Sequence, residues 1–426
     1  MAISKLKGTT DYFGIEAKKY DLIIDKCKHV AQRFGFQEIR TPIIESTDLF
    51  VRGVGDGSDI VKKEMYTFDD KGHRSITLRP EGTASVTRSF VENKMYANPG
   101  LQKFYYHGPM FRYERPQAGR FRQFSQFGVE VFGDESPLLD ADVINMCYLM
   151  LKEVGIKNCE VHINTIGAGE TRTKYVNALK DHFAPYLDSM CPDCKERYER
   201  NTLRILDCKV DRNNVALQTA PSIQNYLSDE DRVYFNKILE TLDILGVPYV
   251  IDDHLVRGLD YYTGCVFECI LKDESSELNN VAIAAGGRYN GLSKELGGPD
   301  TKAIGYAFGV DRLMILENEI NSLDLADVTV ITLGEETKKH GMTLANFLRK
   351  GGLKVEIDYK NHNLKPQFKL ADRVRSPYIV IIGEEEVNNN IVKVKDTINK
   401  TELILEIEKL NEYFKLNGEE LYAYKK

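Results

Sequence analysis

The clearest hydrophobic pattern in this chain is a pair of alternating segments separated by a short polar loop. Residues 105–111 read YYHGPMF, and residues 127–133 read FGVEVFG. Apolar residues at every second position are typical of β-strands with one buried face. The loop ERPQAG between them predicts a hairpin. Antiparallel pairing then brings Arg112 onto one surface with Gln126 and Glu130.

Helical spacing of apolar residues predicts two helices outside this hairpin. The first runs from Lys18 to Phe34, and Gly35 provides its stop. The second runs from Asp140 to Val154, after the helix-breaking pair Ser136-Pro137. Both patterns place a stripe of apolar side chains on one helix face.

Further strands are predicted on both sides of the hairpin. FQEIRTPII reads as a strand in which Pro42 requires an edge or a bend. RSITLRPEGT reads as a strand that carries Glu81 and Thr83 to its end. After the second helix and a long charged segment, strands are expected around Arg257, at residues 265–271 and at residues 281–285.

The character of the chain changes twice. From about residue 168 to 247 it is charged and mostly helical in period, which predicts a helical insertion. Beyond residue 325 the strand-length runs DVTVITLG, LKVEIDY, YIVIIG and NIVKVKD alternate with helical stretches at 335–350 and 364–375. We therefore predict an α+β core with an antiparallel sheet at 1–325, and an α/β domain with a mainly parallel sheet at 326–426.

Composition narrows the class of protein. The chain has 426 residues, which is too long for one core, and 42% of them are hydrophobic. A formal net charge of −7 argues against a general nucleic-acid coat but leaves room for a local basic path. No stretch reaches the roughly 20 apolar residues of a membrane span, and the N-terminus lacks the apolar core of a secretion signal. We expect a cytoplasmic protein.

Eight cysteines are scattered along the chain, and one pair is close in sequence. Cys191 and Cys194 form a Cys-x-x-Cys unit, and Cys208 follows fourteen residues later. This is half of a zinc ribbon, but a second Cys-x-x-Cys or a histidine pair is missing. The expectation is unligated thiols and no metal site, with structural zinc as the alternative.

The hairpin also carries the strongest chemical signal. It holds four arginines together with Gln126 and Glu130. A fixed guanidinium such as Arg112 suits a phosphate or carboxylate, while an acid and an amide suit an amine. Two ligands of opposite character on one face indicate activation of an amino acid by a nucleotide. A merely solvated charged face is opposed by the apolar partners Phe111, Phe121, Phe124 and Phe127.

These residues carry a resemblance to a known family. Phe-Arg-x-Glu, a loop and then Arg-x-x-x-Phe resembles motif 2 of class II aminoacyl-tRNA synthetases, and ERPQAGRFRQF resembles the histidyl-tRNA synthetase version, bacterial type. Four further strings are similar to peptides of that family: GFQEIRTPIIE (motif 1), GYAFGVDRL (motif 3), LVRGLDYYTGCVFE at residues 255–268 and AAGGRYNGL at residues 284–292. The match runs from Gly8 to the C-terminus.

The resemblance implies ATP-dependent ligation of L-histidine to tRNA(His) through a histidyl-adenylate intermediate, with Mg²⁺ as the accompanying ion. It implies a class II synthetase-type antiparallel sheet and a homodimer formed through motif 1. The C-terminal α/β domain, with the matching string LKPQFKLAD, becomes the anticodon-binding domain. The inserted helical subdomain is expected to cover the active site or grip RNA.

The resemblance also assigns roles to individual residues. The catalytic cations are Arg257 and Arg112. The implied histidine-binding residues are Glu81, Gly82, Thr83, Arg112, Gln126, Glu130, Arg257, Tyr261 and Tyr262. The implied ATP-binding residues are Arg112, Glu114, Arg120, Phe124 and Arg312. The carboxylate, amide and phenol chemistry of the first set suits an ammonium and an imidazole with two ring nitrogens.

Several alternatives remain. A catalytically silent paralogue serving as a regulatory subunit of histidine biosynthesis has a similar sequence, but such proteins lack the anticodon domain and residues of the Arg257 peptide. A class II enzyme for another amino acid is opposed by Glu130 together with Tyr261 and Tyr262. Arg257 itself could be structural, in an ion pair with Asp260 close by in sequence.

Overall fold

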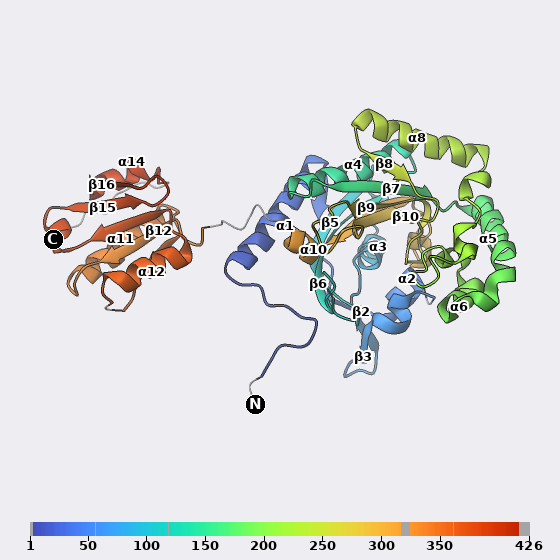
Figure 1. Ribbon diagram of the computed structural model, residues 1–426, viewed down its shortest axis with the longest axis horizontal. Helices are drawn as coiled ribbons and strands as arrows, with labels where there is room; N and C mark the ends of the chain where they lie inside the picture. The colour runs from blue at the N-terminus through green and yellow to red at the C-terminus, as the bar shows by residue number, and fades with distance from the viewer. Residues whose placement is uncertain (1–2, 56, 118, 317–323, 361, 417–426) are drawn as a thin grey trace. The chain divides into compact units, whose positions relative to one another are not determined.

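The computed structural model describes residues 3–55, 57–117, 119–316, 324–360 and 362–416 (Figure 1). The chain divides into two compact units, Met1–Asp11 with Tyr20–Asn318, and Tyr12–Lys19 with Glu319–Lys426. The first unit contains the large sheet, and each unit is considered by itself. In the described part of the chain, no helix combines the length and the apolar character that crossing a membrane requires.

The first unit is built on an eight-stranded sheet. Its order is β1-β5-β6-β11-β10-β9-β7-β8. The six inner strands pair antiparallel, while β1 and β8 pair parallel at the two edges. The strands are β1 (Gln37–Glu38), β5 (Gln102–Phe111), β6 (Gln123–Phe132), β7 (Cys159–Thr165), β8 (Tyr249–Ile251), β9 (Thr263–Leu271), β10 (Ala282–Arg288) and β11 (Ala303–Gly309). The predicted antiparallel core sheet is confirmed.

The predicted hairpin is β5 paired with β6. Its register places Gly108 opposite Gln126 and Phe104 opposite Glu130. Aromatic rings stack across the sheet beside this pair: Tyr105 on Phe127 at 5.7 Å between centroids, and Phe127 on Phe308 at 5.5 Å. This buried row fixes one face of the hairpin, so its alternate residues are held toward the opposite face. The connection is longer than predicted and contains Ala118, which lies outside the described residues.

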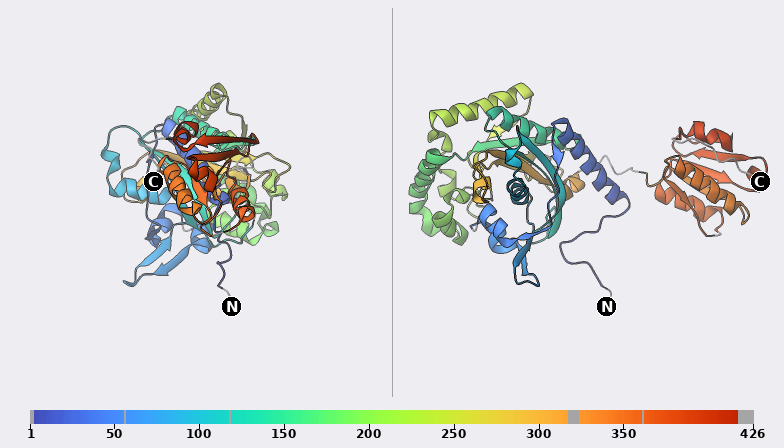
Figure 2. Two further views of the ribbon diagram at one scale, coloured as in Figure 1. Left: turned by 90° about the vertical axis from the view of Figure 1, so that its left-hand side faces the viewer. Right: turned by 180° about the vertical axis from the view of Figure 1, so that it is seen from behind.

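Helices cover the sheet where the sequence predicts amphipathic stretches. α1 (Ile15–Arg33) ends before Gly35, and α4 (Pro137–Glu153) begins at Ser136, whose side chain accepts a hydrogen bond from the Leu138 amide at 3.2 Å. α4 packs against β9, β10 and β11. α3 (Thr83–Glu92), which the sequence pattern did not indicate, packs against β6. The right-hand view of Figure 2 shows α3 end-on beside the strands.

A second, three-stranded sheet contains the end of motif 1, and its strand β4 leads to Glu81. Its order is β2-β4-β3, with β2 (Ile44–Ser46), β3 (Tyr66–Asp69) and β4 (Ser75–Leu78) all antiparallel. The predicted single strand FQEIRTPII is therefore wrong in part: it divides into β1 and β2. Pro42 lies in the break, where no backbone N–H is needed for a ladder.

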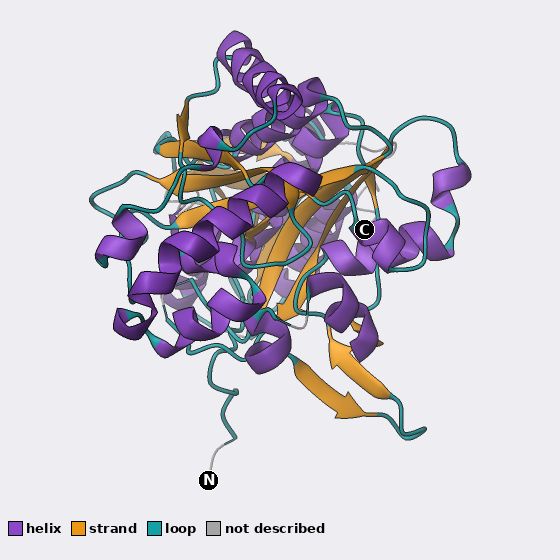
Figure 3. Cartoon of the chain, turned by 90° about the vertical axis from the view of Figure 1, so that its right-hand side faces the viewer, coloured by secondary structure: helices purple, strands orange, loops and turns teal. Residues whose placement is uncertain are grey.

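The insertion between β7 and β8 is helical, as predicted. It contains α5 (Gly169–Phe183), α6 (Pro192–Arg200), α7 (Val215–Gln218) and α8 (Asp229–Leu245), with short 3₁₀ turns between them. α8 packs along α4. α5 and α6 lie at the right of the first unit in Figure 1, so in Figure 3, which is seen from that side, they lie in front of the strands of the large sheet. Buried residues of α5 and α6 form one apolar cluster with Tyr106, Met110 and Phe132 of the hairpin, so the insertion is packed onto the core.

The second unit is an α/β sandwich with five strands in the order β13-β12-β14-β15-β16. The strands are β12 (Val328–Thr332), β13 (Val355–Ile357), β14 (Tyr378–Ile382), β15 (Ile391–Asp396) and β16 (Thr401–Glu406). α11 (Thr337–Lys350) packs in a cluster with Val328 and Val330, whereas α12 (Leu364–Val374) packs with Ile331. Because neighbouring residues of a strand point to opposite faces, the two helices cover opposite faces of the sheet.

Two sequence expectations about the strands need correction. The second sheet is mixed, because β12, β13 and β14 are parallel while β14, β15 and β16 pair antiparallel. The link between β14 and β15 holds only the five-residue helix α13 (Glu384–Asn388), too short for a parallel crossover. In the first unit Arg257 lies in an irregular segment between β8 and β9, and not in a strand.

Candidate active site

A cavity of about 540 Å³ opens beside the β5–β6 hairpin. Such a volume falls within the range of small-molecule sites. The predicted site segments meet there: the β4–α3 junction, the hairpin, the Arg257 segment and the start of α10 (Val310–Leu316), together with strands β10 and β11, residues 59–64 and part of the insertion. Of the predicted site residues, these line it: Glu81, Thr83, Arg112, Glu114, Arg120, Phe124, Gln126, Arg257, Tyr261, Tyr262 and Arg312. Gly82 and Glu130 do not.

Glu81 is held by the first turn of α3. Its carboxylate accepts hydrogen bonds from the backbone amides of Thr83 at 2.7 Å and Ala84 at 2.8 Å. These amides are unsatisfied at any helix start, so the acid caps the helix. Burial raises the pKa of Glu81, although these hydrogen bonds oppose the rise. The cap fixes the carboxylate in position at the cavity wall.

Glu130 lies beneath the cavity and not in its lining. Its carboxylate accepts hydrogen bonds from Thr83 Oγ1 at 2.7 Å, from the Tyr289 hydroxyl at 2.5 Å and from the Tyr106 hydroxyl at 3.3 Å. The residue is 1% exposed, and burial raises its pKa to about 8. A Cβ at Gly305, on the neighbouring strand, would collide with this carboxylate. Thr83 and Tyr106 line the cavity, so Glu130 acts on it through them.

Replacing Glu130 with glutamine is expected to make the protein less sensitive to alkaline pH. The ordinary pKa is 4.5, so ionising Glu130 is harder in the folded state than in the unfolded chain. Its contribution to stability is therefore largest below about pH 4.5 and is lost as pH rises through about 8. The unfolding midpoint of Glu130→Gln minus that of the parent should become more positive from about pH 5 to about pH 9, by an amount equivalent to a few kcal/mol.

Thermal unfolding across this pH range measures the difference, and Glu274→Gln supplies the control because Glu274 is an exposed carboxylate. The control difference should stay flat. A Glu130→Gln difference that is equally flat would contradict a buried carboxyl group that resists ionisation.

Gly82 has a packing role that the sequence did not reveal. A Cβ at Gly82 or at Gly128 would collide with the Tyr106 ring. Both glycines therefore let Tyr106 lie flat beneath the cavity, where its hydroxyl reaches Glu130. Gly82 was predicted to contact a ligand, but it does not line the cavity; it is the N-cap residue of α3.

Three of the predicted arginines, Arg112, Arg120 and Arg312, line the cavity as well. Arg112 donates from Nε to the Pro80 carbonyl at 2.8 Å, and its guanidinium lies 5.3 Å from the Phe124 ring centroid. Arg312 donates from Nη1 to the Ala282 carbonyl at 2.7 Å. Arg120 pairs with Glu114 at 3.0 Å. Backbone carbonyls and one carboxylate hold these cations in place, so they present fixed positive charge to the cavity.

Arg257 forms an ion pair with Glu268 on β9, and not with Asp260 as the structural alternative proposed. Asp260 instead accepts a hydrogen bond from the Asn201 amide at 2.7 Å. The Arg257 guanidinium also lies 5.6 Å from the Tyr262 ring centroid. Its Nε has no hydrogen-bond partner among the described residues, and the same holds for Gln126 Oε1. A buried donor and a buried acceptor without partners at one cavity indicate a ligand that satisfies them.

Sequence reasoning missed three participants. Tyr106 opens the hairpin segment and Tyr289 belongs to AAGGRYNGL, yet neither was singled out, because their partner Glu130 is distant in sequence. Glu268 ends the Arg257 peptide, and only the β9 register shows that its side chain returns to Arg257. A tyrosine or an acid inside an already recognised peptide is the signal that could have found them.

Antiparallel strands carrying an Arg-x-Glu hairpin, together with an arginine where a strand passes into a helix, define the catalytic core of a class II aminoacyl-tRNA synthetase. Comparisons with known proteins narrow this class. The family model described as histidyl-tRNA synthetase matches residues 8–313, and the model described as anticodon binding domain matches residues 327–417. The chain belongs to the histidyl-tRNA synthetase family.

Relatives and a solved structure agree with this assignment. Histidine–tRNA ligase of Staphylococcus haemolyticus is 46% identical over 413 residues, covering 96% of this chain and 98% of that protein. The enzyme of the same name from Staphylococcus aureus strain JH9 is 44% identical, covering 96% and 99%. The crystal structure of apo Staphylococcus aureus histidyl-tRNA synthetase matches with a TM-score of 0.81 and 39% identity, covering 97% and 100%.

Proposed function

We propose that this chain is a histidine–tRNA ligase, which joins L-histidine to tRNA(His) at the expense of ATP through a histidyl adenylate. The observation that carries the proposal is the convergence of Arg112, Arg257 and Gln126 on one cavity. It is supported by 44–46% identity to histidine–tRNA ligases over 96% of the chain. A regulatory subunit of histidine biosynthesis is not favoured, because this identity extends through both units.

In the first step a histidine carboxylate oxygen attacks the α-phosphorus of ATP, and pyrophosphate leaves. Negative charge increases at that phosphorus, so cations fixed beforehand stabilise the transition state more than the ground state. Arg112 and Arg257 supply this charge from two walls of the cavity. Their hydrogen bonds to the Pro80 carbonyl and to Glu268 keep them oriented before substrate arrives.

Histidine is bound by the acceptors near α3 and by the tyrosines. Gln126 Oε1 accepts a hydrogen bond from the histidine ammonium group, which satisfies its lack of a partner in the described residues. Glu81 and Thr83 complete the ammonium site, and Tyr262, with Tyr261 against it at 4.7 Å, bonds a ring nitrogen. Glu130 acts on the other ring nitrogen through the Thr83 and Tyr106 hydroxyls. Such a site rejects side chains without a ring nitrogen, because its polar groups would stay unpaired.

ATP is the second substrate, placed by the cationic side of the cavity. Phe124 stacks on adenine, Arg120 and Glu114 border the phosphates, and Arg312 reaches the terminal phosphate. Glu114 and Glu64 are cavity carboxylates that would hold a Mg²⁺ ion accompanying the phosphates. Burial and then the charge of Glu114 raise the pKa of Glu64, so a cation between the two acids would relieve their repulsion. The ion offsets phosphate charge.

The remaining proposals concern the domains, the oligomeric state and the location of the protein in the cell. Residues 1–325 form the catalytic core with its insertion at about 168–247, and residues 326–426 bind the tRNA anticodon. A homodimer forms through motif 1, supported by Ile43 and Ile44, which are 42% and 51% exposed in the single chain. The enzyme acts in the cytoplasm, where tRNA is charged.

ATP–pyrophosphate exchange with each of the twenty amino acids tests this function. Exchange is expected with histidine alone, and transfer to tRNA(His) should follow in a second assay. Heat-denatured protein and omission of amino acid provide the background. A folded protein that gives no exchange with histidine would reject ligase activity and direct attention to the regulatory role.

A further inference from the structure

Four potential metal ligands converge in the insertion, at the start of α6. The ligand atoms of Cys191, Cys194, Cys208 and Asp211 all lie within 4.8 Å of one another. In the described part of the chain, no other group of three or more such side chains is as close. We propose that these residues bind one zinc ion, which has a structural role and holds α6 against the catalytic cavity.

The spacing of the ligand atoms matches tetrahedral zinc. With a Zn–S bond of about 2.3 Å, two sulfur ligands of a tetrahedron lie roughly 3.8 Å apart. Cys191 Sγ and Cys208 Sγ are 3.7 Å apart, and Cys208 Sγ lies 3.8 Å from Asp211 Oδ2. A disulfide would require about 2.05 Å between the two sulfurs. Four ligands of this kind close the coordination sphere, as in structural and not catalytic sites.

The four proposed zinc ligands come from two short segments of the backbone, with two ligands in each. Cys191 precedes α6 and Cys194 lies in its first turn, while Cys208 and Asp211 lie in turns after the 3₁₀ helix η4 (Thr202–Ile205). Each pair therefore has the x-x spacing of a zinc knuckle, with an aspartate replacing the last cysteine. The Asp211 amide donates to Cys208 Sγ at 3.4 Å, and the Cys191 amide donates to Asp211 Oδ2 at 3.0 Å. Such bonds orient metal ligands.

Burial supplies an independent argument. Cys194 is fully buried, and Cys208 and Asp211 are 5% and 8% exposed. Asp211 forms no ion pair with a lysine, arginine or histidine in the described residues. A buried carboxylate needs a partner, and direct coordination to zinc would provide one. Binding releases the three thiol protons and leaves a site with a net charge of −2.

A second pair of close thiols lacks the additional ligands found in this cluster. Cys147 and Cys269 also lie 3.7 Å apart between their sulfurs, and both are buried. They belong to the core beneath α4 and have no carboxylate beside them in a group of this kind. Two sulfur atoms lying close together are therefore not sufficient evidence of a metal site. Cys147 offers a matched control for removal of a buried thiol.

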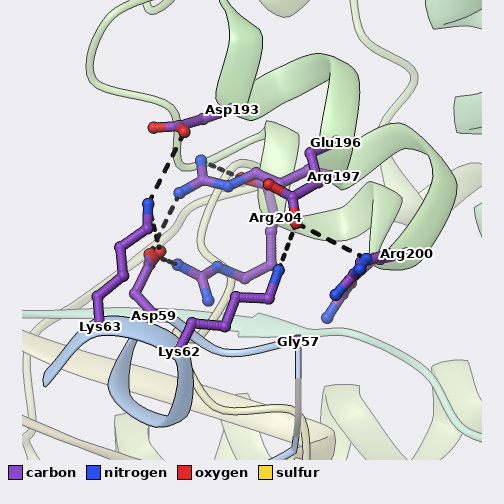
Figure 4. Close-up of a pocket in the computed structure, with 10 residues that line it drawn as sticks. Gly57, Asp59, Lys62, Lys63, Asp193, Glu196, Arg197, Arg200 and Arg204 are labelled. Carbon is purple, nitrogen blue, oxygen red and sulfur yellow. Dashed lines mark hydrogen bonds and ion pairs between the residues drawn. The ribbon is translucent and has the colours of Figure 1, made fainter. Parts of the chain in front are cut away.

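The site connects to catalysis through α6 and η4. Arg197, Arg204, Cys208 and Lys209 line the catalytic cavity, and Arg204 donates to the Gly258 carbonyl at 2.9 Å, next to Arg257. Figure 4 shows how this segment meets the turn η1 (Ile60–Glu64): Asp59 lies 3.4 Å from Arg204 and 3.6 Å from Arg197, and Lys62 pairs with Glu196 at 2.5 Å. Zinc bound at the N-terminal end of α6 would hold this wall of the catalytic cavity in a fixed position.

Metal analysis of the full-length protein, purified under reducing conditions with zinc in the growth medium, tests the proposal. About one equivalent of zinc per chain is expected after dialysis. Cys208→Ser and Asp211→Asn should lower that content or raise the dissociation constant at least about tenfold. Cys147→Ser should retain full zinc. A parent protein with less than about a tenth of an equivalent, or variants that retain zinc like the control, would overturn the proposal.

Cobalt substitution keeps the test valid if a variant fails to fold. Removal of zinc from the parent by a chelator and addition of Co²⁺ should produce thiolate-to-cobalt charge transfer and the intense visible bands of tetrahedral cobalt. The same treatment should make three of the eight thiols reactive, and zinc should protect them again. Octahedral cobalt spectra, or a Cys191–Cys208 disulfide in the freshly purified protein, would reject a zinc site.

Discussion

Arg257→Ala is expected to lower kcat/KM for histidine-dependent ATP–pyrophosphate exchange by about 10²–10³. The guanidinium lies at the cavity wall, oriented by Glu268 and Tyr262, with a free Nε among the described residues. Because it meets charge that develops at the α-phosphorus, its loss should appear mainly in kcat. Initial rates across histidine and ATP concentrations measure the split between kcat and KM.

A second variant separates catalysis from folding at this position. Removal of Arg257 leaves Glu268 buried without its partner, and burial already raises the pKa of Glu268. Arg257→Ala is therefore expected to lower the unfolding midpoint as well. Arg257→Ala with Glu268→Gln should recover the midpoint without recovering exchange. Recovery of both would mean that Arg257 only stabilises the fold.

Arg257→Lys provides the conservative control. Lysine retains the positive charge but lacks the planar fork that can contact Glu268 and a phosphate together. An intermediate loss is expected, smaller than that of the alanine variant. If lysine and alanine cost the same, then geometry and not charge determines the effect, and the electrostatic role of Arg257 would need revision.

The sequence predicted those elements whose signal is local. The β5–β6 hairpin follows from alternation, and α1 and α4 follow from helical spacing with Gly35 and Ser136 at their ends. The site residues were predicted from the motif resemblance, and most of them line one cavity. Each of these signals is contained in about ten to twenty consecutive residues, so periodicity and capping suffice to read it.

The expectations that failed depend on how the chain folds back on itself, which periodicity does not show. The pairing of Glu268 with Arg257 follows from the return of β9 toward the loop before it. Asp211 was missed as a partner of the cysteines because an aspartate alone in a turn is common in any sequence. The antiparallel β15 could not be distinguished from a parallel strand by its pattern, since only the length of the preceding link decides its direction.

Arg288→Met is expected to destabilise the catalytic unit by about 3–5 kcal/mol, which lowers its unfolding midpoint by roughly 6–10 °C. Arg288 is 2% exposed and pairs with the fully buried Asp140 of α4 at 2.5 Å. It also donates to the Asp134 carbonyl at 2.8 Å and to the Tyr234 hydroxyl of α8 at 3.0 Å. One side chain thus joins β10, α4 and α8.

This prediction gives the AAGGRYNGL peptide two separate roles. Tyr289 bonds Glu130 beneath the cavity, whereas Arg288 holds helices on the other side of the sheet. Arg288→Met should therefore reduce stability while the remaining folded enzyme keeps its exchange activity at low temperature. Arg40→Met is the matched control: Arg40 is exposed and, among the described residues, forms an ion pair only with Glu38, so the midpoint should hardly change.

The loss of stability in Arg288→Met is expected to come from the buried charge of Asp140, and two further measurements can test this. Burial raises the pKa of Asp140 to about 6, and Arg288 limits that rise. Without Arg288 the acid should protonate more readily, so the penalty of Arg288→Met should shrink as pH falls toward about 6 and level off below that value. The double variant Asp140→Leu with Arg288→Met should recover most of the lost stability, because no charge is then left buried. A penalty that persists in the double variant and at low pH would assign it to lost packing between α4 and β10 instead.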